Sequence, residues 1–553
     1  MTQTFLVIGV VVVYTLVLIY STSPATTPNA SGTVPATVSS FPRSGKLAGV
    51  SAFQRHQQLR HRAPTETKQQ HQQHDNNDRV SENNRRRAAI LEMTHHAWSS
   101  YMKAAAGSDE LKPISNSSTN KWGNIGVTPI DSLDTLFVMN MKKEFAEAQE
   151  LLRHVDMRQS MQPLSVFETI IRHVGGTLSA YALTNDTMFL DFAKSTVDGL
   201  MHAFDGPLSF PAHITRFRGT PADNQYIAKD KFMLAEFGSF QMELRYLAHL
   251  TGDQKYTDAC DAVKTFLVDL KSRGWPSNPA LYEPDEPIMP HRGLFPTFVT
   301  QRGTFAGAAG YAAMMDSFYE YLLKQWIQFG KKDDWLLELY EDAVEGLLEY
   351  LLRYSENTNY AILGYLGHTY HPTMDHLACF APGMLLLGVM HGAHSYPNRN
   401  RPFSSDDVVA AATDIAATCY RFYVDSPTGL SGDSVEFNLN GTYTVRYPKY
   451  ILRPEVLESI FYLYRYTHDE RYRDWGWRIA EAINTHARTP SGFTALDDVT
   501  TADVVGSDSM ESFFIAETLK YLFLLFSDDS ALPLDEWVLT TEAHPLPILR
   551  SER

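Results

Sequence analysis

The stretch LRPEVLESIFYLYRYTHDERY, at residues 452–472, contains the pattern that decides the fold. Pro454 suits the first turn of a helix, and the residues after it place an apolar stripe at helical spacing. The polar segment THDE then interrupts the stripe, and Asp469 suits the N-cap or first turn of a second helix. The stretch therefore predicts a helix, a short turn and a new helix, with the first stripe formed by Leu452, Val456, Ile460 and Leu463.

Similar turn chemistry recurs along most of the chain. Aspartates precede new apolar-periodic runs at intervals of roughly 60 to 80 residues, about one hairpin of two long helices. Roughly six to seven such hairpins fit between Ala88 and Pro545. A ring of hairpins buries its apolar faces without capping repeats, whereas an open solenoid needs them. The recurring aspartates are Asp186, Asp253, Asp334, Asp406 and Asp469. The sequence therefore predicts an all-α fold, namely a closed α/α barrel, with an α-solenoid scaffold as the alternative.

Composition narrows the class of partner. The chain has 553 residues, of which 64 are acidic and 48 basic, so its net charge is -16. This charge argues against a phosphate-rich partner, and we expect no nucleic acid and a neutral or hydroxyl-rich substrate. No nucleophile elbow, phosphate-binding loop, dinucleotide fingerprint or zinc spacing occurs. The stretch DSLDT, residues 131–135, does not fit an EF-hand, so any bound calcium would need a site assembled from distant pieces.

The N-terminal segment has the composition of a membrane anchor. Residues Phe5–Tyr20 are uncharged and almost wholly apolar, and with their flanks they reach the ~20 residues that span a bilayer. We predict an uncleaved signal anchor at residues 1–23, with a cleaved signal peptide as the alternative. Residues 24–86 are rich in Ser, Thr and Pro and then in Gln and His, which predicts a flexible stem, with metal binding by the His-rich part as the weaker alternative. Residues 87–548 would form the barrel domain.

Five carboxylates lie in helix-patterned, aromatic-rich segments that are far apart in sequence. Acids against apolar neighbours suit a central site that cleaves a bond with a proton donor and a base. Each also has an ordinary alternative. Glu168 and Arg172 are four residues apart and would otherwise form a surface ion pair. Glu455 and Glu458, which follow Pro454, would otherwise only stabilise the N-terminus of a helix through its dipole. Glu517 lies between Phe513 and Tyr521, and such an aromatic stripe is more often part of a hydrophobic core. The five are Glu168, Asp316, Glu455, Glu458 and Glu517.

A dozen runs in register carry a family resemblance. They extend over roughly residues 88–547 and include DSLDTLFVM, VFETIIRHVGGTLSAY, DSFYEYLLKQW, HLACFAPGML, YILRPEVLESIFYLYR, MESFFIAETLKYL and LDEWVLTTEAHPL. In these runs the chain closely resembles glycoside hydrolase family 47, the class I α-1,2-mannosidases. The resemblance implies an (α/α)7 barrel. It also implies calcium-dependent hydrolysis, with inversion, of terminal α-1,2-linked mannose from high-mannose N-glycans on glycoproteins.

The resemblance implies catalytic and metal-binding roles for single residues. Glu168 would be the general acid, Glu455 the general base, and Asp316 a second essential carboxylate whose acid or base role is argued over. Thr541 would bind Ca²⁺ through its hydroxyl and backbone carbonyl, with Glu542 and neighbouring acids holding the waters of the metal. Inversion separates the acid from the base by ~6.5–9.5 Å, and calcium takes six to eight oxygens, so both roles suit distant carboxylates and waters.

The remaining implied roles concern substrate contacts and one disulfide. Cys379 and Cys419 match the disulfide of the family, which leaves Cys260 free. His376 by its own context indicates only a satisfied core histidine. The residues implied in substrate binding are Arg172, Glu236, His376, Arg453, Glu458, Phe513, Glu517 and Glu542.

Specificity and location are predicted from fewer residues. Met314 lies two residues before Asp316, where ER-type members of the family usually have an arginine and Golgi-type members an apolar residue. We therefore expect broad trimming of the Golgi type. We also expect a type II membrane protein of the Golgi or endoplasmic reticulum with a luminal catalytic domain, and secretion after signal cleavage is the alternative. A glycan-binding mannosidase-like protein of ER-associated degradation is the alternative function. The oligomeric state is not predicted. Sequons at Asn29, Asn116, Asn185 and Asn440 fit the secretory pathway.

Overall fold

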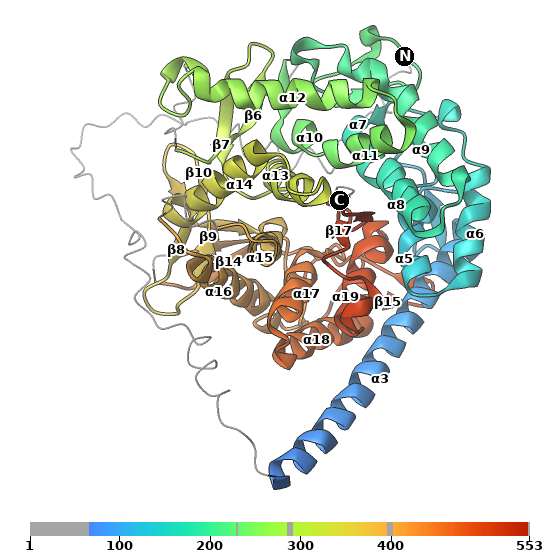
Figure 1. Cartoon of the computed structure of the whole chain (residues 1–553). Helices are drawn as coiled ribbons and strands as arrows, with labels where there is room; N and C mark the ends of the chain where they lie inside the picture. The colour runs from blue at the N-terminus through green and yellow to red at the C-terminus, as the bar shows by residue number, and fades with distance from the viewer. Residues whose placement is uncertain (1–65, 228–229, 285–290, 395–401, 439, 551–553) are drawn as a thin grey trace, which may run out of the picture.

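The helices of this chain follow one another around a ring in chain order (Figure 1). The computed structural model describes residues 66–227, 230–284, 291–394, 402–438 and 440–550, with side chains from residue 79 onward. The inner helices, which contact one another from pair to pair, are α5 (Leu133–Val138), α8 (Gly175–Thr184), α11 (Gln241–Thr251), α13 (Asp316–Gln328), α15 (Ala381–Met390), α17 (Glu455–Thr467) and α19 (Lys520–Leu525). Their outer partners are α6 (Lys142–Arg153), α9 (Thr187–Leu200), α12 (Lys255–Ser272), α14 (Asp334–Gly346), α16 (Ser405–Val424), α18 (Glu470–His486) and α3 (Glu66–Ala104).

The ring closes on itself. Helix α19 and the π-helical segment η9 (Phe514–Leu519), near the end of the chain, contact α3, and η9 also contacts α5. The apolar faces thus meet in one large core, as expected for hairpins that need no capping repeats. The prediction of a closed α/α barrel is confirmed, and the alternative of an open solenoid is wrong.

The recurring aspartates begin helices in most, but not all, of the predicted places. Asp186 and Asp469 are N-caps whose side chains accept from the backbone N–H of Met188 and Arg471. Asp334 and Asp406 lie in the first turns of α14 and α16. Asp253 is not the cap of α12, because the N-cap is Gln254. The turn signal therefore located the hairpins better than it located the capping residue.

The description of the fold as all-α is incomplete, because short strands join the helices. A five-stranded sheet has the order β11-β10-β7-β6-β5, a three-stranded sheet has the order β12-β13-β14, and the described strands pair antiparallel. These strands have two to five residues, too few to display a period-2 pattern in the sequence. The members of the two sheets are β5 (Lys231–Met233), β6 (Pro296–Thr300), β7 (Phe305–Ala309), β10 (Tyr365–Leu366), β11 (Tyr370–His371), β12 (Thr373–Asp375), β13 (Ser434–Phe437) and β14 (Tyr443–Tyr447).

The remaining elements are short. One hairpin, β17–β18, pairs Val538 with Leu546, and β17 lies near the centre of the ring (Figure 1). Besides β17 (Trp537–Leu539) and β18 (Pro545–Pro547), the strands are β1 (Glu110–Lys112), β2 (Ser117–Thr119), β3 (Leu164–Ser165), β4 (Ile214–Thr215), β8 (Leu352–Tyr354), β9 (Ala361–Leu363), β15 (Arg488–Thr489) and β16 (Gly492–Phe493). The short helical segments include α4 (Val127–Asp131), α7 (Val166–Glu168), α10 (Leu234–Gly238), η2 (Thr169–Val174), η7 (Leu347–Leu351) and η8 (His376–Phe380).

The N-terminal predictions meet the structure only in part. Helix α3 begins at Glu66, so residues 66–86, predicted as flexible stem, are helical. This helix is tied to α18 because Asn83 donates to Glu470 at 3.4 Å and Arg86 pairs with Asp474 at 2.9 Å. The predicted anchor at residues 1–23 lies outside the described residues. Within residues 66–550 where the structure describes them, no helix combines the length and apolarity needed to cross a bilayer.

The predicted disulfide is confirmed. Cys379 of η8 is bonded to Cys419 of α16, with the two Cα atoms 6.1 Å apart. Cys260 of α12 is free and buried. The bridge thus ties η8, which begins at His376, to the outer helix α16.

Candidate active site

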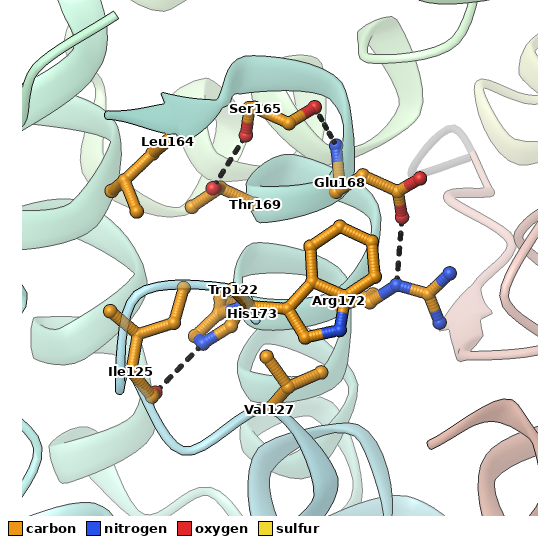
Figure 2. Close-up of a pocket in the computed structure, with 9 residues that line it drawn as sticks. All are labelled: Trp122, Ile125, Val127, Leu164, Ser165, Glu168, Thr169, Arg172 and His173. Carbon is orange, nitrogen blue, oxygen red and sulfur yellow. Dashed lines mark hydrogen bonds and ion pairs between the residues drawn. The ribbon is translucent and has the colours of Figure 1, made fainter. Parts of the chain in front are cut away.

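Glu168 and Arg172 form the first part of the site. Ser165 begins the helix, because its hydroxyl accepts from the Glu168 N–H at 3.3 Å. The helix then continues as the π-helical segment η2, which contains Arg172. Arg172 Nε donates to Glu168 Oε2 at 2.8 Å (Figure 2). The predicted i, i+4 pair therefore exists, and the Ser165 cap fixes the turn from which Glu168 projects.

Arg172 is a buried hub, not a surface ion pair. Its side chain is 9% exposed, and Nη1 lies 2.7 Å from Glu542 Oε2 and 3.3 Å from Asp131 Oδ2. Burial alone would lower the pKa of Arg172, but Glu542, Glu168 and Asp131 raise it well above its usual value. A permanently charged guanidinium thus joins the Glu168 segment to the β17–β18 hairpin.

Two aromatic rings flank this guanidinium. The Cζ of Arg172 lies 5.8 Å from the ring centroid of Phe513, a predicted substrate residue, and 5.8 Å from that of Trp122. Trp122 was not predicted, because it lies in a stretch without helical periodicity, KWGNIG at residues 121–126. Figure 2 shows its indole beside the Glu168–Arg172 pair. The cavity drawn there has a volume of about 10 Å³, space for about one water and far too little for a sugar ring.

Glu455 is held in place by its neighbours. It is the first residue of α17, and His376 Nδ1 lies 2.7 Å from its Oε2. The other ring nitrogen of His376 lies 2.7 Å from the Tyr423 hydroxyl, so both nitrogens have partners. Arg453 Nη1 lies 3.7 Å from Glu455 Oε1. His376 is thus a satisfied buried histidine, as its own context indicated, and it also orients a predicted catalytic acid.

Arg453 has a second partner that was not predicted. Its Nε donates to Asp433 Oδ1 at 2.5 Å. Burial would raise the pKa of Asp433, yet Arg453 and His376 lower it below its usual value. Asp433 follows no helical pattern in the sequence, because it precedes strand β13, and only its position in space reveals the pairing.

Asp316 lies near Glu455 and holds its proton more tightly than a free aspartate. Burial raises the pKa of Asp316 to about 7, the Ser317 N–H lowers it, and the negative charges of Glu320 and Glu455 raise it further. Asp316 begins α13, and its Oδ1 accepts from the Ser317 N–H at 2.8 Å. A carboxyl with a pKa near neutrality is suited to either acid or base catalysis.

A second group of acids includes Glu542, which lies in the turn after β17. Burial raises the pKa of Glu458 to about 8 and that of Glu542 to about 8, although Lys324 and Arg172 respectively lower them. Burial raises the pKa of Glu517 well above its usual value, and Glu542, Glu455 and Glu458 raise it further. These mutual effects require the carboxylates to lie close together. Without a further cation nearby, these carboxyl groups therefore hold their protons more tightly than free glutamates.

This clustering of carboxyl groups bears on whether a metal fits. Among the residues that the structure describes, no three acidic, histidine or cysteine side chains are grouped so that they could ligate an ion directly. Thr541, between Thr540 and Glu542, offers hydroxyl and carbonyl oxygens in the tight turn. Oxygen donors, few direct ligands and nearby carboxylates suit a hard, hydrated cation such as Ca²⁺ and do not suit zinc. The residues present thus fit the predicted ion.

Glu236 lies close to the same centre. His213 Nδ1 is 2.6 Å from Glu236 Oε1. Burial would lower the pKa of His213, but Glu236 and then Glu168 raise it, which places this pair within the field of Glu168. The structure thus places the predicted acids Glu168, Asp316, Glu455, Glu458, Glu517 and Glu542 within reach of one another's charges, on α7, α13, α17, η9 and the turn of the β17–β18 hairpin.

The comparisons agree with this geometry. The profile of glycosyl hydrolase family 47 matches residues 93–548. The chain belongs to this family. It is 40% identical to a human endoplasmic reticulum mannosyl-oligosaccharide 1,2-alpha-mannosidase over 84% of this chain and 64% of that protein, so the match spans about two thirds of the length of that relative. The family assignment made from the sequence runs is confirmed.

Two further members of the family support the assignment. A mannosyl-oligosaccharide 1,2-alpha-mannosidase of Arabidopsis thaliana is 39% identical over 84% of this chain and 79% of that protein. The solved structure of an alpha-1,2-mannosidase from Trichoderma reesei matches this family member with a TM-score of 0.74 at 27% identity, over 84% of this chain and 99% of that one. The barrel and the order of its helices are therefore those of a known family structure.

Proposed function

We propose that this family 47 member hydrolyses terminal α-1,2-linked mannose from high-mannose N-glycans on glycoproteins, with inversion at the anomeric carbon. The observation that carries the proposal is the separate anchoring of two acids, Glu168 by Arg172 and Glu455 by His376. Rigid, differently paired carboxylates are what an inverting glycosidase needs on the two faces of a sugar. The names of the human and Arabidopsis relatives support the same substrate.

The chemistry assigns one proton to each acid. Protonated Glu168 would donate to the glycosidic oxygen as the bond to the anomeric carbon breaks, and Glu455 would accept a proton from the water that attacks that carbon. A separation of ~6.5–9.5 Å between the acid and the base leaves room for this water. Asp316, with its pKa near 7, is a further acid that could exchange a proton at neutral pH.

The substrate-binding proposal follows the surroundings of these acids. Arg172 and Arg453 would donate to sugar hydroxyls, and Phe513 would pack against the apolar face of the ring. Glu236, Glu458, Glu517 and Glu542 would accept from hydroxyls or from waters, and His376 would keep Glu455 in orientation. Thr541 would hold Ca²⁺ through its hydroxyl and carbonyl. When bound, the ion would supply fixed positive charge that orients sugar oxygens.

Further details of the predictions also stay proposals. Each inner helix has an outer partner, which supports an (α/α)7 count. From the sequence, residues 87–548 stay the proposed catalytic barrel, 1–23 the proposed anchor and 24–86 the proposed stem, of which residues 66–86 belong to helix α3. We propose a luminal, type II protein of the Golgi or endoplasmic reticulum. The human relative is named for the endoplasmic reticulum, whereas Met314 favours the broad trimming of the Golgi type.

The test uses purified protein and labelled α-1,2-mannobiose, with α-1,3- and α-1,6-mannobiose as linkage controls. We expect release of mannose from the α-1,2 disaccharide, with the β-anomer appearing first in the proton NMR spectrum. A chelator should abolish turnover and added Ca²⁺ should restore it. Binding of the glycan without cleavage would favour a glycan-binding protein instead, and first appearance of the α-anomer would exclude inversion.

A further inference from the structure

A chain of buried charges lies behind the candidate active site. Lys520 Nζ is 2.6 Å from Asp134 Oδ1, and Asp134 Oδ2 is 2.6 Å from His544 Nδ1. His544 Nε2 is in turn 3.2 Å from Asp131 Oδ1, and the other oxygen of Asp131 faces Arg172. All four side chains, Lys520, Asp134, His544 and Asp131, are 0% exposed. The chain thus runs without interruption from the last inner helix to the guanidinium that holds Glu168.

The surroundings of His544 favour its positively charged form. Its Nδ1 hydrogen-bonds with Asp134 Oδ2 at 2.6 Å, and its Nε2 lies 3.2 Å from Asp131 Oδ1, close enough for charge attraction but not aligned for a hydrogen bond. Burial would lower the pKa of His544, but Asp134 and Asp131 raise it to about 9. The network therefore alternates cation and anion, so that its buried charges compensate one another.

Two glycines make room for the imidazolium. A Cβ at Gly175 would lie 2.8 Å from His544 Cδ2, and a Cβ at Gly176 would lie 2.7 Å from the Ile130 carbonyl oxygen and 3.3 Å from His544 Cε1. Contacts below about 3 Å are shorter than carbon atoms tolerate, so the pair in HVGG lets the ring reach both aspartates. The structure explains the Gly-Gly pair of that motif by close packing against His544.

The same network holds the turn that contains Thr541 and Glu542. Lys520 Nζ donates to the Ala543 carbonyl at 2.7 Å. Within the turn, the Thr540 N–H donates to the His544 carbonyl at 3.0 Å and the Ala543 N–H to the Thr540 carbonyl at 3.0 Å. Ala543 has a φ of 56°, a left-handed conformation that a non-glycine residue keeps only when its surroundings impose it. Lys520 and His544 thus hold the C-terminal end of this turn, at Ala543 and His544.

We propose that Lys520, Asp134 and His544 are positioning residues, which act through Asp131 to set the orientation of Arg172 and through the turn to set that of Thr541 and Glu542. The inference rests on the proposed function, because it assigns a purpose to the residues behind that site. Buried partners of ligand-bearing groups are typically worth 10–100-fold in metal affinity or activity. A merely structural network would affect stability without changing the calcium affinity or the kinetic constants of the folded protein.

Asp134→Asn is the sharpest probe, because it keeps the shape and removes the central charge while leaving Arg172, Glu542 and Thr541 unchanged. Three quantities are measured: the calcium concentration needed for half-maximal thermal stabilisation, KM and kcat on α-1,2-mannobiose, and the Arg172–Glu542 separation in a crystal structure. Glu144→Gln is the matched control, because it weakens a carboxylate–histidine pair, at 3.0 Å from His95, that joins α6 to α3.

The expected result is a loss of roughly 10–100-fold in calcium affinity and in kcat for Asp134→Asn, with a smaller change in KM and no such loss in Glu144→Gln. The 2.7 Å contact between Arg172 and Glu542 should be broken in the variant. Calcium affinity and kcat within about twofold of wild type would overturn the inference, whatever the change in melting temperature.

Two provisions keep this test decisive. If Asp134→Asn does not fold, Lys520→Met, which removes the terminal charge but keeps a straight side chain, is measured in the same way. If wild-type protein neither binds calcium nor releases mannose, the proposed function fails. The crystal structures then decide on the positioning role, which an unchanged Arg172–Glu542 contact in the variant would reject.

Discussion

Asp316→Asn is expected to make this protein more stable at pH 8 while removing its activity. Burial raises the pKa of Asp316 from 3.8 to about 7. A carboxyl with a higher pKa in the folded than in the unfolded state binds more protons when folded, so its ionisation destabilises the fold as the pH rises from about 4 to about 7. Asparagine has a similar shape and never ionises. Its advantage over aspartate should therefore grow with pH.

The magnitude follows from the size of the shift. At 1.36 kcal/mol per pKa unit, the penalty for ionised Asp316 reaches about 4 kcal/mol above pH 7 and is about 1.6 kcal/mol at pH 5. The stability of the variant relative to wild type should thus increase by about 2–3 kcal/mol between pH 5 and pH 8. For a domain of this length, unfolding entropy of ~2.1 cal/mol/K per residue converts each kcal/mol to about 1 °C, so we expect about 2–3 °C.

The assay compares thermal unfolding of wild type and Asp316→Asn at pH 5 and pH 8 with a chelator present. Turnover of α-1,2-mannobiose by both proteins is measured separately. Asp198→Asn is the control. Burial would raise the pKa of Asp198, but Lys194, Lys255 and Tyr256 lower it to about 2. The stabilisation from this group is complete above pH 4 and lost only toward pH 2, so the control should show the same difference at pH 5 and pH 8. A pH-independent effect of Asp316→Asn would refute the reasoning.

Four further predictions concern other parts of the molecule. Glu168→Gln and Glu455→Gln should each lower kcat by ~10²–10⁴-fold without unfolding the protein, and retention of more than about a tenth of kcat would reject the assignment of their roles. Chelation should remove activity and lower the melting temperature, because a ligand that binds only the folded state stabilises that state. Thr541→Ala should have the same two effects, and a melting temperature that does not change with calcium would contradict both expectations. Replacing Cys379 and Cys419 by Ala should cost about 4 kcal/mol, since the crosslink spans 40 residues, and peptide mapping that finds two free thiols in native protein would contradict it. Met314→Arg should narrow the products released from a nine-mannose glycan, and accumulation of one eight-mannose isomer by the unmutated enzyme would contradict broad trimming.

The sequence revealed those parts of the fold and site that have local periodicity. Asp186 and Asp469 were predictable because an N-cap and the helix it begins are neighbours in sequence. The Glu168–Arg172 pair was predictable because residues four apart share a helix face. Strands of two to five residues have no such signal, and those of the five-stranded sheet come from segments as distant as Lys231 and His371.

The residues behind the site were hidden for a different reason. The stretch DSLDT does not fit an EF-hand, and nothing local shows that Asp131 and Asp134 would face His544, about 410 positions later in the chain. Trp122 and Asp433 were missed in the same way, because each lies outside a periodic helix. An ion pair between distant segments depends on the tertiary fold, so it leaves no periodic pattern in the sequence of either segment.

The buried acids differ by the groups that face them, and this difference orders their proposed roles. Glu168 and Glu455 each have a basic partner within 2.8 Å, Arg172 and His376, which fixes the direction of the carboxyl group. Glu542 also pairs with Arg172 at 2.7 Å, but Glu458, Glu517 and Glu542 lie in addition within one another's field, and burial with mutual repulsion raises their pKa. An oriented carboxyl suits a directed proton transfer, whereas a set of carboxylates in mutual repulsion gains most from an added cation. A calcium ion at Thr541 would therefore stabilise the second set directly. Chelation and the Glu168 and Glu455 substitutions should differ in their effect on stability, because only chelation removes a ligand of the folded state, and so only chelation should lower the melting temperature.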